Sequence, residues 1–280
     1  MGVTNRNIAE AGKILAAAIK KWKLADDGEV FRTHSSLLKP VVYKGKPAML
    51  KVPFSFEERR GCLLMTCYNG NGAAEVWEHN DGAFLMERAI GTDSLKQMVD
   101  NEKEDEANKI ICSVAKTLHA VKCPDITELI PLTKWFHPLE LAAIKYGGTL
   151  VDCNRVAGDL LNAPIDTAIL HGDLHYENVL DSGIRGWIAI DPKGLTGERG
   201  FDFANIFCNP DSKTATSPSR LFKQVKLIAK EAGLDPRRLL QWVIAWSGLS
   251  AAFMLDDRED PCVPLIVSQI AQNELANYSV

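Results

Sequence analysis

The sequence predicts an α+β protein of two lobes, in which a small lobe of antiparallel strands precedes a larger, mostly helical lobe. Three observations predict it. Short apolar runs separated by Gly, Asn and Pro turns fill the first third of the chain, up to about Glu87. Apolar residues recur at helical spacing through most of the chain beyond that point. The 280 residues, 46% of them apolar and 24% charged, suit one large domain or two modest ones. We therefore expect lobes at residues 1–88 and 89–280.

The small lobe is predicted to open with a helix and to continue mainly as strands. Apolar residues at helical spacing from Ile8 to Trp22 predict an amphipathic helix. The elements that follow are, in order, a polar turn at 31–36, strands at 37–43 and 48–52 joined by a turn at 44–47, a helix at 57–68, a loop at 69–72, and strands near 75–79 and 82–87.

The large lobe is predicted to consist of helices around one polar loop. A stripe from Ile110 to Val121 predicts one helix, and 135–161 predicts a helix or two, interrupted at Gly147-Gly148. From Arg220 onwards we expect three helices, broken at 233–236 and 256–264. Two short β-like runs, 168–170 and 187–190, bracket the polar loop between these helical blocks.

Composition excludes several classes of protein. The 32 basic and 36 acidic residues give a net charge of −4, which argues against a nucleic-acid binder and leaves room for a cationic substrate. No run reaches the roughly 20 apolar residues of a membrane helix, and the first residues lack the apolar core of a secretion signal. The seven cysteines include no CxxC pair, so we expect reduced thiols in a cytoplasmic protein.

The chemistry is concentrated in the polar loop, Ile169-Leu-His-Gly-Asp-Leu-His-Tyr-Glu-Asn-Val-Leu180, and in Ile190-Asp-Pro192. These segments place Asp173, Asn178 and Asp191 at the ends of short strands. A carboxylate such as Asp173 can orient an alcohol and accept its proton during phosphoryl transfer. Oxygen atoms of Asn178 and Asp191 are hard ligands suited to Mg²⁺, which bridges nucleotide phosphates.

A competing interpretation of this loop is a zinc hydrolase. His171 and His175 are four residues apart and Glu177 is close by. An HExxH site, however, needs both histidines on one helical face with a glutamate beside the first. Here Gly172 follows the first histidine, the flanks are β-like and the glutamate follows the second, so we expect His171 to be a structural hinge of the loop.

The polar loop resembles the catalytic loop of eukaryotic-like kinases, HxDxxxxN followed by a metal-binding aspartate. The glycine between His171 and Asp173 is typical of the aminoglycoside phosphotransferase branch. More narrowly, the chain resembles the streptomycin 6-kinase and hydroxyurea kinase family over roughly residues 30 to 275. That likeness rests on the loop, Ile190-Asp-Pro192, Gly194-Leu-Thr-Gly-Glu198, Asp235-Pro-Arg-Arg-Leu-Leu240, Leu249-Ser-Ala-Ala252 and, more weakly, Thr33-His-Ser-Ser-Leu37.

The resemblance implies a protein-kinase-like fold and a role for particular residues. Lys51 matches the strand lysine that contacts the nucleotide α and β phosphates, and its helix partner is Glu58 or Glu57. Asp173 is then the catalytic residue, and Asn178 and Asp191 hold the metal. The remaining implied roles are phosphate binding by Ser35 and Ser36, adenine contacts by the backbone of Glu87 and Ala89 with Met86 behind, and bracing of the catalytic loop by Asp202.

The resemblance implies an ATP- and Mg²⁺-dependent phosphotransferase. The expected acceptor is a hydroxyl of a cationic aminoglycoside such as streptomycin, and the expected consequence is antibiotic resistance. Two alternatives stay open: a kinase of another small hydroxylated metabolite or of hydroxyurea, and a nucleotide-binding pseudokinase. A P-loop enzyme is excluded because the chain contains no GxxxxGK[ST].

The acceptor residues are sought in the acidic run Asp256, Asp257, Glu259 and Asp260, at a predicted helix break. A cationic drug with guanidinium groups needs planar carboxylate partners. The other dense acidic run, Glu102–Glu106, stands at the start of a helix, where acids favour the helix dipole. We therefore expect Asp256 and Asp257 to contact the substrate.

Overall fold

The computed structural model of the chain describes residues 5–80, 82–123 and 129–278. The small lobe contains a six-stranded antiparallel sheet of order β1-β3-β4-β6-β5, to which β2 adds by pairing with β3. Its elements are α1 (Asn5–Trp22), β1 (Ala25–Asp26), β2 (Phe31–Arg32), β3 (Ser36–Tyr43), β4 (Lys46–Pro53), α2 (Phe56–Tyr68), β5 (Val76–His79) and β6 (Phe84–Glu87).

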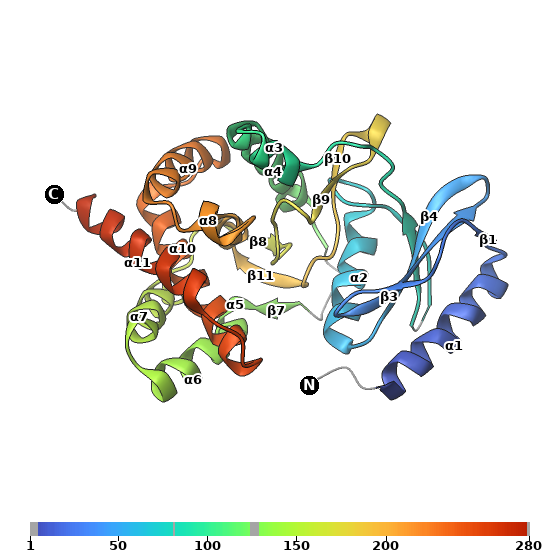
Figure 1. Ribbon diagram of the computed structural model, residues 1–280, viewed down its shortest axis with the longest axis horizontal. Coiled ribbons are helices and arrows are strands. Elements are labelled where there is room, and N and C mark those ends of the chain that lie inside the picture. Colours follow the sequence, from blue (N-terminus) through green and yellow to red (C-terminus); the bar gives the residue numbers. More distant parts are fainter. Residues whose placement is uncertain (1–4, 81, 124–128, 279–280) are drawn as a thin grey trace.

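Helices α1 and α2 flank this sheet. The apolar stripe of α1 packs on β3 and β4, with Leu15 and Ala18 buried against Val41 and Leu50. Figure 1 shows α1 on the outer side of the sheet and α2 on the side that faces the large lobe. Ser55 caps α2, because its side chain accepts a hydrogen bond from the Glu58 amide at 3.2 Å. This cap fixes where the helix that carries Glu58 begins.

The large lobe surrounds two small sheets with helices. β10 pairs with β9, and β11 lies between β7 and β8. Its elements are α3 (Leu95–Asp100), α4 (Glu104–Ala120), β7 (Ile130–Pro131), α5 (Leu132–Trp135), α6 (His137–Tyr146), α7 (Thr149–Asn162), β8 (Thr167–Leu170), β9 (Val179–Asp181), the 3₁₀ turn η1 (Gly183–Arg185), β10 (Trp187–Ala189), β11 (Leu195–Glu198), the 3₁₀ segment η2 (Arg199–Cys208), α8 (Ser212–Ala215), α9 (Pro218–Ala232), α10 (Pro236–Asp256) and α11 (Cys262–Asn277).

The predicted element types are largely those of the structure, and two of the differences concern strands. The turn expected at 31–36 contains the short strand β2 and the start of β3. The β-like runs at 168–170 and 187–190 do form strands, but each pairs with a segment that the pattern did not single out, β11 and β9. Short strands such as Leu195–Glu198, which contains a glycine, lack the alternation that identifies longer ones.

Helix α10 corrects one expectation about membranes. By length and composition it could cross a bilayer, and it is the one such helix among the described residues, although we expected no run of that kind. The most apolar 18-residue stretch of α10 is 61% buried inside the protein, where the helix packs on α7, α11 and η2. Core helices of folded domains share this composition.

Helix α2 is packed into the large lobe as well as onto the sheet. Its C-terminal half, with Leu64 and Tyr68, belongs to the same buried cluster as α4 and β10. A Cβ atom on Gly61 would lie 1.8 Å from the carbonyl oxygen of Pro192, so glycine allows the helix to touch the backbone beside Asp191. The position of α2 is therefore tied to the segment that follows β10.

A disulfide also joins α2 to the large lobe, and it overturns one sequence expectation. Cys67 at the end of α2 is bonded to Cys123, beyond the end of α4, with 5.9 Å between their Cα atoms. We expected reduced thiols throughout. The remaining five cysteines are free. Proximity of two cysteines 56 residues apart depends on the tertiary fold, which spacing in the sequence does not reveal.

Candidate active site

The loop between β8 and β9 is held in place by Asp202. This buried carboxylate accepts hydrogen bonds from the amide of His171 at 3.0 Å and from the amide of Gly172 at 2.7 Å. His119 from α4 contacts the same carboxylate at 2.8 Å. Asp202 thus braces the loop, as the sequence predicted, and fixes the backbone from which Asp173 projects.

His171 is a structural residue of this loop. Its side chain is fully buried, its Nε2 lies 2.8 Å from the carbonyl oxygen of Ile190, and burial lowers its pKa. Residues 171–178 form no helix, so the histidine pair lacks the helical face that an HExxH site requires. The described residues hold no group of three His, Cys, Asp or Glu side chains arranged for a metal ion. The zinc interpretation therefore has no support.

Asp173 lies at the centre of the site with both carboxylate oxygens in contact. Asn205 donates to its Oδ1 at 2.8 Å, and the ammonium of Lys193 lies 3.4 Å from Oδ2. The side chain is 27% exposed, so an acceptor can still reach it. A carboxylate held in this way is suited to orient a hydroxyl group and to accept its proton.

Asn178 and Asp191 come together through the backbone. The Ile190 amide donates to the Asn178 carbonyl oxygen at 2.9 Å, next to Asp191. The side-chain amide nitrogen of Asn178 donates to the Asp173 carbonyl oxygen at 2.8 Å, so the atom of this side chain that could bind a metal is its oxygen. Asp191 has φ 59, in the left-handed region that few non-glycine residues occupy and that aspartate adopts more readily than most.

These two residues suit Mg²⁺, which needs only one or two ligands from the protein. They are too few for a metal whose ligands all come from protein side chains. Mg²⁺ commonly takes one or two carboxylates and completes its shell with phosphate oxygens and water. One carboxylate and one amide oxygen match that requirement. Burial would raise the pKa of Asp191, but the neighbouring Lys51 holds it below the usual value, so Asp191 is charged at neutral pH.

Lys51 joins Asp191 to α2. Its buried ammonium lies 2.5 Å from Asp191 Oδ1 and 3.5 Å from Glu58 Oε2. Burial would lower the pKa of Lys51, whereas Cys62, Asp191 and Glu58 beside it raise it above its ordinary value. Of the two candidate partners, Glu58 makes the ion pair and Glu57 is exposed.

The other residues expected to bind the nucleotide stand at the start of β3 and at or just after the end of β6. Ser36 is fully buried and its hydroxyl has no hydrogen-bond partner among the described residues, whereas Ser35 is half-buried. Met86 is 6% exposed, at the end of β6. The Glu87 amide donates to the Glu75 carbonyl oxygen at 2.8 Å, and its carboxylate accepts from Ser182 and Arg185. Ala89 follows two residues later, half-buried. Adenine and phosphate contacts at these residues stay predictions.

Two residues of the site carried no role in the sequence interpretation. Lys193 lies between Asp173 and Glu58, with 3.3 Å from its Nζ to Glu58 Oε1, and Asn205 holds Asp173. Burial would lower the pKa of Lys193, but Asp173 and Glu58 raise it. The available signal for Lys193 was its position two residues after Asp191. Asn205 stands in the segment Gly200–Asn205, where Asp202 drew attention instead.

Asp256 and Asp257 lie elsewhere, at the end of α10. Both are exposed. Asp256 borders a cavity of about 370 Å³ together with Lys145, Tyr146 and Phe253. No hydrogen bond or ion pair among the described residues joins either aspartate to the cluster around Asp173. Contact with substrate stays a prediction for both.

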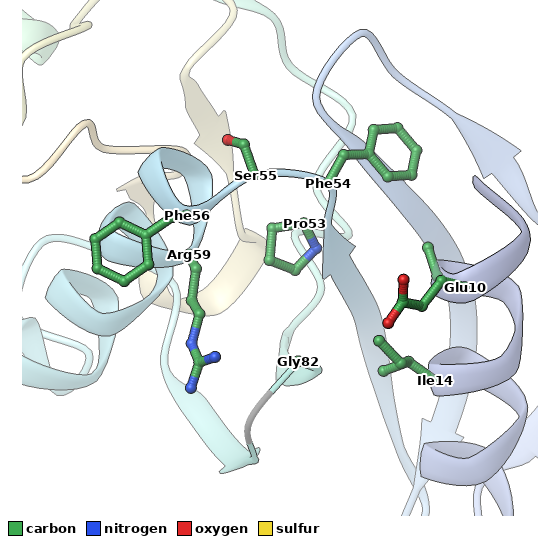
Figure 2. A pocket seen from close by; sticks show the side chains of 9 residues that line it. Glu10, Ile14, Pro53, Phe54, Ser55, Phe56, Arg59 and Gly82 are labelled. Atoms are coloured by element: carbon green, nitrogen blue, oxygen red, sulfur yellow. The ribbon is translucent and has the colours of Figure 1, made fainter. Parts of the chain in front are cut away.

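A second cavity, of about 340 Å³, lies between α1 and the start of α2, beside Pro53 and Phe54 at the end of β4. Figure 2 shows Glu10 and Ile14 of α1 on one side of it and Phe56 and Arg59 of α2 on the other. Its lining includes Ser55, the cap of α2, but none of the residues around Asp173. It therefore belongs to the packing between the two helices of the small lobe.

The fold and the site together define a phosphotransferase of the protein-kinase-like class. A strand lysine paired with a helix glutamate, a loop aspartate, and an asparagine and an aspartate at the ends of short strands are the parts that phosphoryl transfer needs.

Comparison with known proteins identifies the family. Residues 21–258 match the family model "Aminoglycoside/hydroxyurea antibiotic resistance kinase". The chain is 46% identical to a streptomycin 3''-kinase of Klebsiella pneumoniae over 85% of this chain and 91% of the relative. It is 28% identical to a streptomycin 6-kinase of Streptomyces griseus over 95% of this chain and 89% of the relative. The chain belongs to the aminoglycoside/hydroxyurea antibiotic resistance kinase family.

Solved structures agree on the fold. A thermostable mutant of an aminoglycoside phosphotransferase, crystallised with ADP and hygromycin B, superposes with a TM-score of 0.65 at 13% identity, over 93% of this chain and 98% of the other. Choline kinase from Cryptosporidium parvum gives a TM-score of 0.62 at 13% identity, over 96% and 97% of the two chains. These likenesses confirm the predicted protein-kinase-like fold.

Proposed function

We propose that this protein transfers the γ-phosphoryl group of ATP to a hydroxyl group of streptomycin, with Mg²⁺ held by Asn178 and Asp191. The observation that carries the proposal is the placement of Asp173, whose Oδ1 accepts a hydrogen bond from the Asn205 side-chain amide while Lys193 lies 3.4 Å from Oδ2. A metal ion at Asn178 and Asp191 would neutralise charge on the β and γ phosphates.

The protein's own residues would act in the following way. Lys51 would contact the α and β phosphates from its position between Asp191 and Glu58. Asp173 would orient the acceptor hydroxyl and take its proton as the new oxygen–phosphorus bond forms. The bond between the γ phosphorus and the β–γ bridging oxygen would break, and ADP would leave with the bonding electrons. Asn205 would keep the Asp173 carboxylate directed at the acceptor.

The identity of the acceptor and the nucleotide is supported by the comparisons. The relative at 46% identity is named for phosphorylation of streptomycin at the 3'' position, so we propose the 3'' hydroxyl as the site of transfer. ADP in the crystallised phosphotransferase supports an adenine nucleotide. Adenine would meet the backbone of Glu87 and Ala89 beside Met86, and Ser35 and Ser36 would meet the phosphates, in a cleft between lobes at 1–88 and 89–280.

The proposed setting is the cytoplasm, where the enzyme would act on the free drug and not on a nucleic acid or a membrane. Phosphorylation adds about two negative charges to a molecule recognised through positive ones. The cell would gain resistance because the modified drug loses electrostatic attraction to its target.

An acceptor screen tests this proposal. ADP release by the purified protein is measured with Mg·ATP and streptomycin, other aminoglycosides, hydroxyurea and choline-like alcohols. We expect turnover with streptomycin at least tenfold above the rate with any other acceptor. Turnover with hydroxyurea alone would favour that alternative, and no turnover with any alcohol would favour a pseudokinase.

We also propose that Asp256 and Asp257 attract the cationic acceptor. Both carboxylates are exposed, and Asp256 borders a cavity that Lys145, Tyr146 and Phe253 also line, whose aromatic rings suit a guanidinium group. The double change Asp256→Asn and Asp257→Asn should raise KM for streptomycin several-fold and leave kcat and the KM for ATP little changed. Asp159→Asn on α7, also exposed, serves as the control. An unchanged KM for streptomycin would show that these residues form only a surface turn.

A further inference from the structure

Lys193 is a charged residue of the site, but it has no role in the phosphoryl transfer proposed for Lys51, Asp173, Asn178 and Asp191. It stands two residues after Asp191, and its own amide donates to the His171 carbonyl oxygen at 2.7 Å. This hydrogen bond anchors the residue to the backbone of the catalytic loop. The lysine therefore belongs to the same rigid unit as Asp173.

The ammonium of Lys193 completes an alternating chain of charges. Lys51 contacts Asp191 at 2.5 Å and Glu58 Oε2 at 3.5 Å. Lys193 contacts the other oxygen of Glu58, Oε1, at 3.3 Å and Asp173 Oδ2 at 3.4 Å. Glu58 therefore separates two cations, one beside the proposed metal ligand and one beside the proposed proton acceptor.

The ammonium of Lys193 is close enough to Asp173 to reach the phosphoryl group during transfer. An acceptor oxygen that gives its proton to Asp173 lies about 2.6–3.2 Å from that carboxylate. The phosphorus under attack lies about 3–3.5 Å from the same oxygen. Because Lys193 is within 3.4 Å of the carboxylate and is 30% exposed, its flexible stem can bring the ammonium to the transferring group without a change of backbone.

We propose that Lys193 is a further catalytic residue, which contacts the γ-phosphoryl oxygens while the group passes from ATP to the acceptor and ADP leaves. The inference rests on the proposed function. Charge on the equatorial oxygens spreads in the transition state, and a cation aimed at them lowers the barrier. In the absence of nucleotide, Glu58 and Asp173 hold this cation in place.

The competing explanation is a brace, in which Lys193 acts only by holding Glu58 and thereby Lys51 and α2. The two roles predict different kinetic effects when Lys193 is replaced by an uncharged residue. Loss of a brace would weaken nucleotide binding and raise KM for ATP. Loss of a contact made in the transition state would lower kcat and kcat/KM together.

The test uses Lys193→Met, which keeps the length of the stem, Lys193→Arg, which keeps the charge, and Glu58→Gln. Lys223→Met is the control, since Lys223 is an exposed lysine of α9 paired with Asp105 at 2.7 Å. We measure kcat and KM for ATP and acceptor, nucleotide affinity by calorimetry, and thermal unfolding. Should Lys193→Met not fold, Lys193→Gln is measured in the same way.

We expect Lys193→Met to lower kcat by roughly a hundredfold or more with nucleotide affinity within about threefold, and Lys193→Arg to recover most of the loss. Adding Lys193→Met to Glu58→Gln should lower kcat again by a similar factor. A kcat within threefold of the wild type would overturn the proposal. So would a loss confined to KM for ATP, or a double variant no slower than Glu58→Gln.

Failure of the proposed function would look different. If the wild type phosphorylates no alcohol, the same variants are compared in ATP hydrolysis, where water is the acceptor. Lys193→Met should then slow hydrolysis by a similar factor, and an unchanged rate would overturn the role of Lys193 separately from the role of streptomycin.

Discussion

The Asp173 carboxylate is oriented before any acceptor binds. Asn205 donates to Oδ1, and Lys193 lies 3.4 Å from Oδ2. Asn205 is itself held, because Asn209 donates to its side-chain oxygen at 2.9 Å. A catalytic side chain that is already fixed by hydrogen-bonded neighbours loses little conformational entropy on reaching the transition state.

Asp173→Asn should lower kcat by about a hundredfold or more while nucleotide affinity stays nearly constant, because a general base acts mainly in the transition state. Steady-state kinetics and calorimetry with Mg·ATP measure both quantities. Asp159→Asn, which changes an exposed carboxylate of α7, should match the wild type. Intact kcat with lost ATP binding would mean that Asp173 has another task.

Asp191→Ala should abolish the dependence of nucleotide affinity on magnesium, and Asn178→Ala should weaken it less, because an amide is a weaker ligand than a carboxylate. Asp191→Ala also leaves the buried Lys51 with Glu58 as its remaining anionic contact, at 3.5 Å. Calorimetric titration with ATP, with and without Mg²⁺, measures the effect. Equal Mg·ATP affinity for Asp191→Ala and the wild type would refute a metal-binding role.

Sequence alone singled out the loop residues and Asp202, which braces the loop, but not the two residues that contact the Asp173 carboxylate. Asp173, Asn178 and Asp191 stand in a compact pattern that a kinase-like motif covers. Asn205 and Lys193 reach Asp173 from 32 and 20 positions further along the chain, through η2 and the segment after β10. Contacts of that kind depend on how elements pack, so no local spacing indicates them.

Among the elements, β11 is fastened to α10 by a buried carboxylate. Glu198 at the end of β11 accepts from Arg238 at 2.6 and 2.7 Å and from the Trp242 indole at 2.7 Å. The Ile165 amide donates to the same carboxylate at 3.0 Å. Burial would raise the pKa of Glu198, but these hydrogen bonds, above all that of Arg238, hold it below its usual value.

A lowered pKa in the folded state stabilises the protein above the ordinary glutamate pKa, and that stability is lost as pH falls through the folded-state pKa. Glu198→Gln should therefore reduce the free energy of unfolding at pH 7 by about 2–4 kcal/mol, with a smaller deficit below about pH 4. Urea unfolding at the two pH values measures this, with the exposed Glu29→Gln as control. An equal deficit at both pH values would contradict the assignment.

Element types were predictable where periodicity is long, as in α1, α4 and α9, each of 15 residues or more. They were not predictable for β2, β7 and β9, each of three residues or fewer, because a strand that short carries no alternation. The disulfide between Cys67 and Cys123 could not be predicted either, because it depends on where α2 meets the end of α4.

On the scale of the whole molecule, α2 couples the two lobes. It carries Glu58 to Lys51 and Lys193, touches the Pro192 carbonyl oxygen through Gly61, and ends at the disulfide. The backbone at 72–74 also pairs with Ala189, because the Ala74 amide donates to its carbonyl oxygen at 3.0 Å. The ion pairs of Lys51 and Lys193 with Glu58 therefore depend on one helix that contacts both lobes. Figure 1 shows α2 between the small-lobe sheet and the large lobe.

The most direct test of this account is the product that the protein makes from streptomycin. The purified chain is incubated with Mg·ATP and the drug, and the product is examined by mass spectrometry and by phosphorus–proton correlation NMR, with Asp173→Asn in parallel. We predict one phosphoryl group on the 3'' hydroxyl, formed by the wild type and nearly absent with Asp173→Asn. Unmodified streptomycin after complete incubation, or equal product from both proteins, would contradict the account.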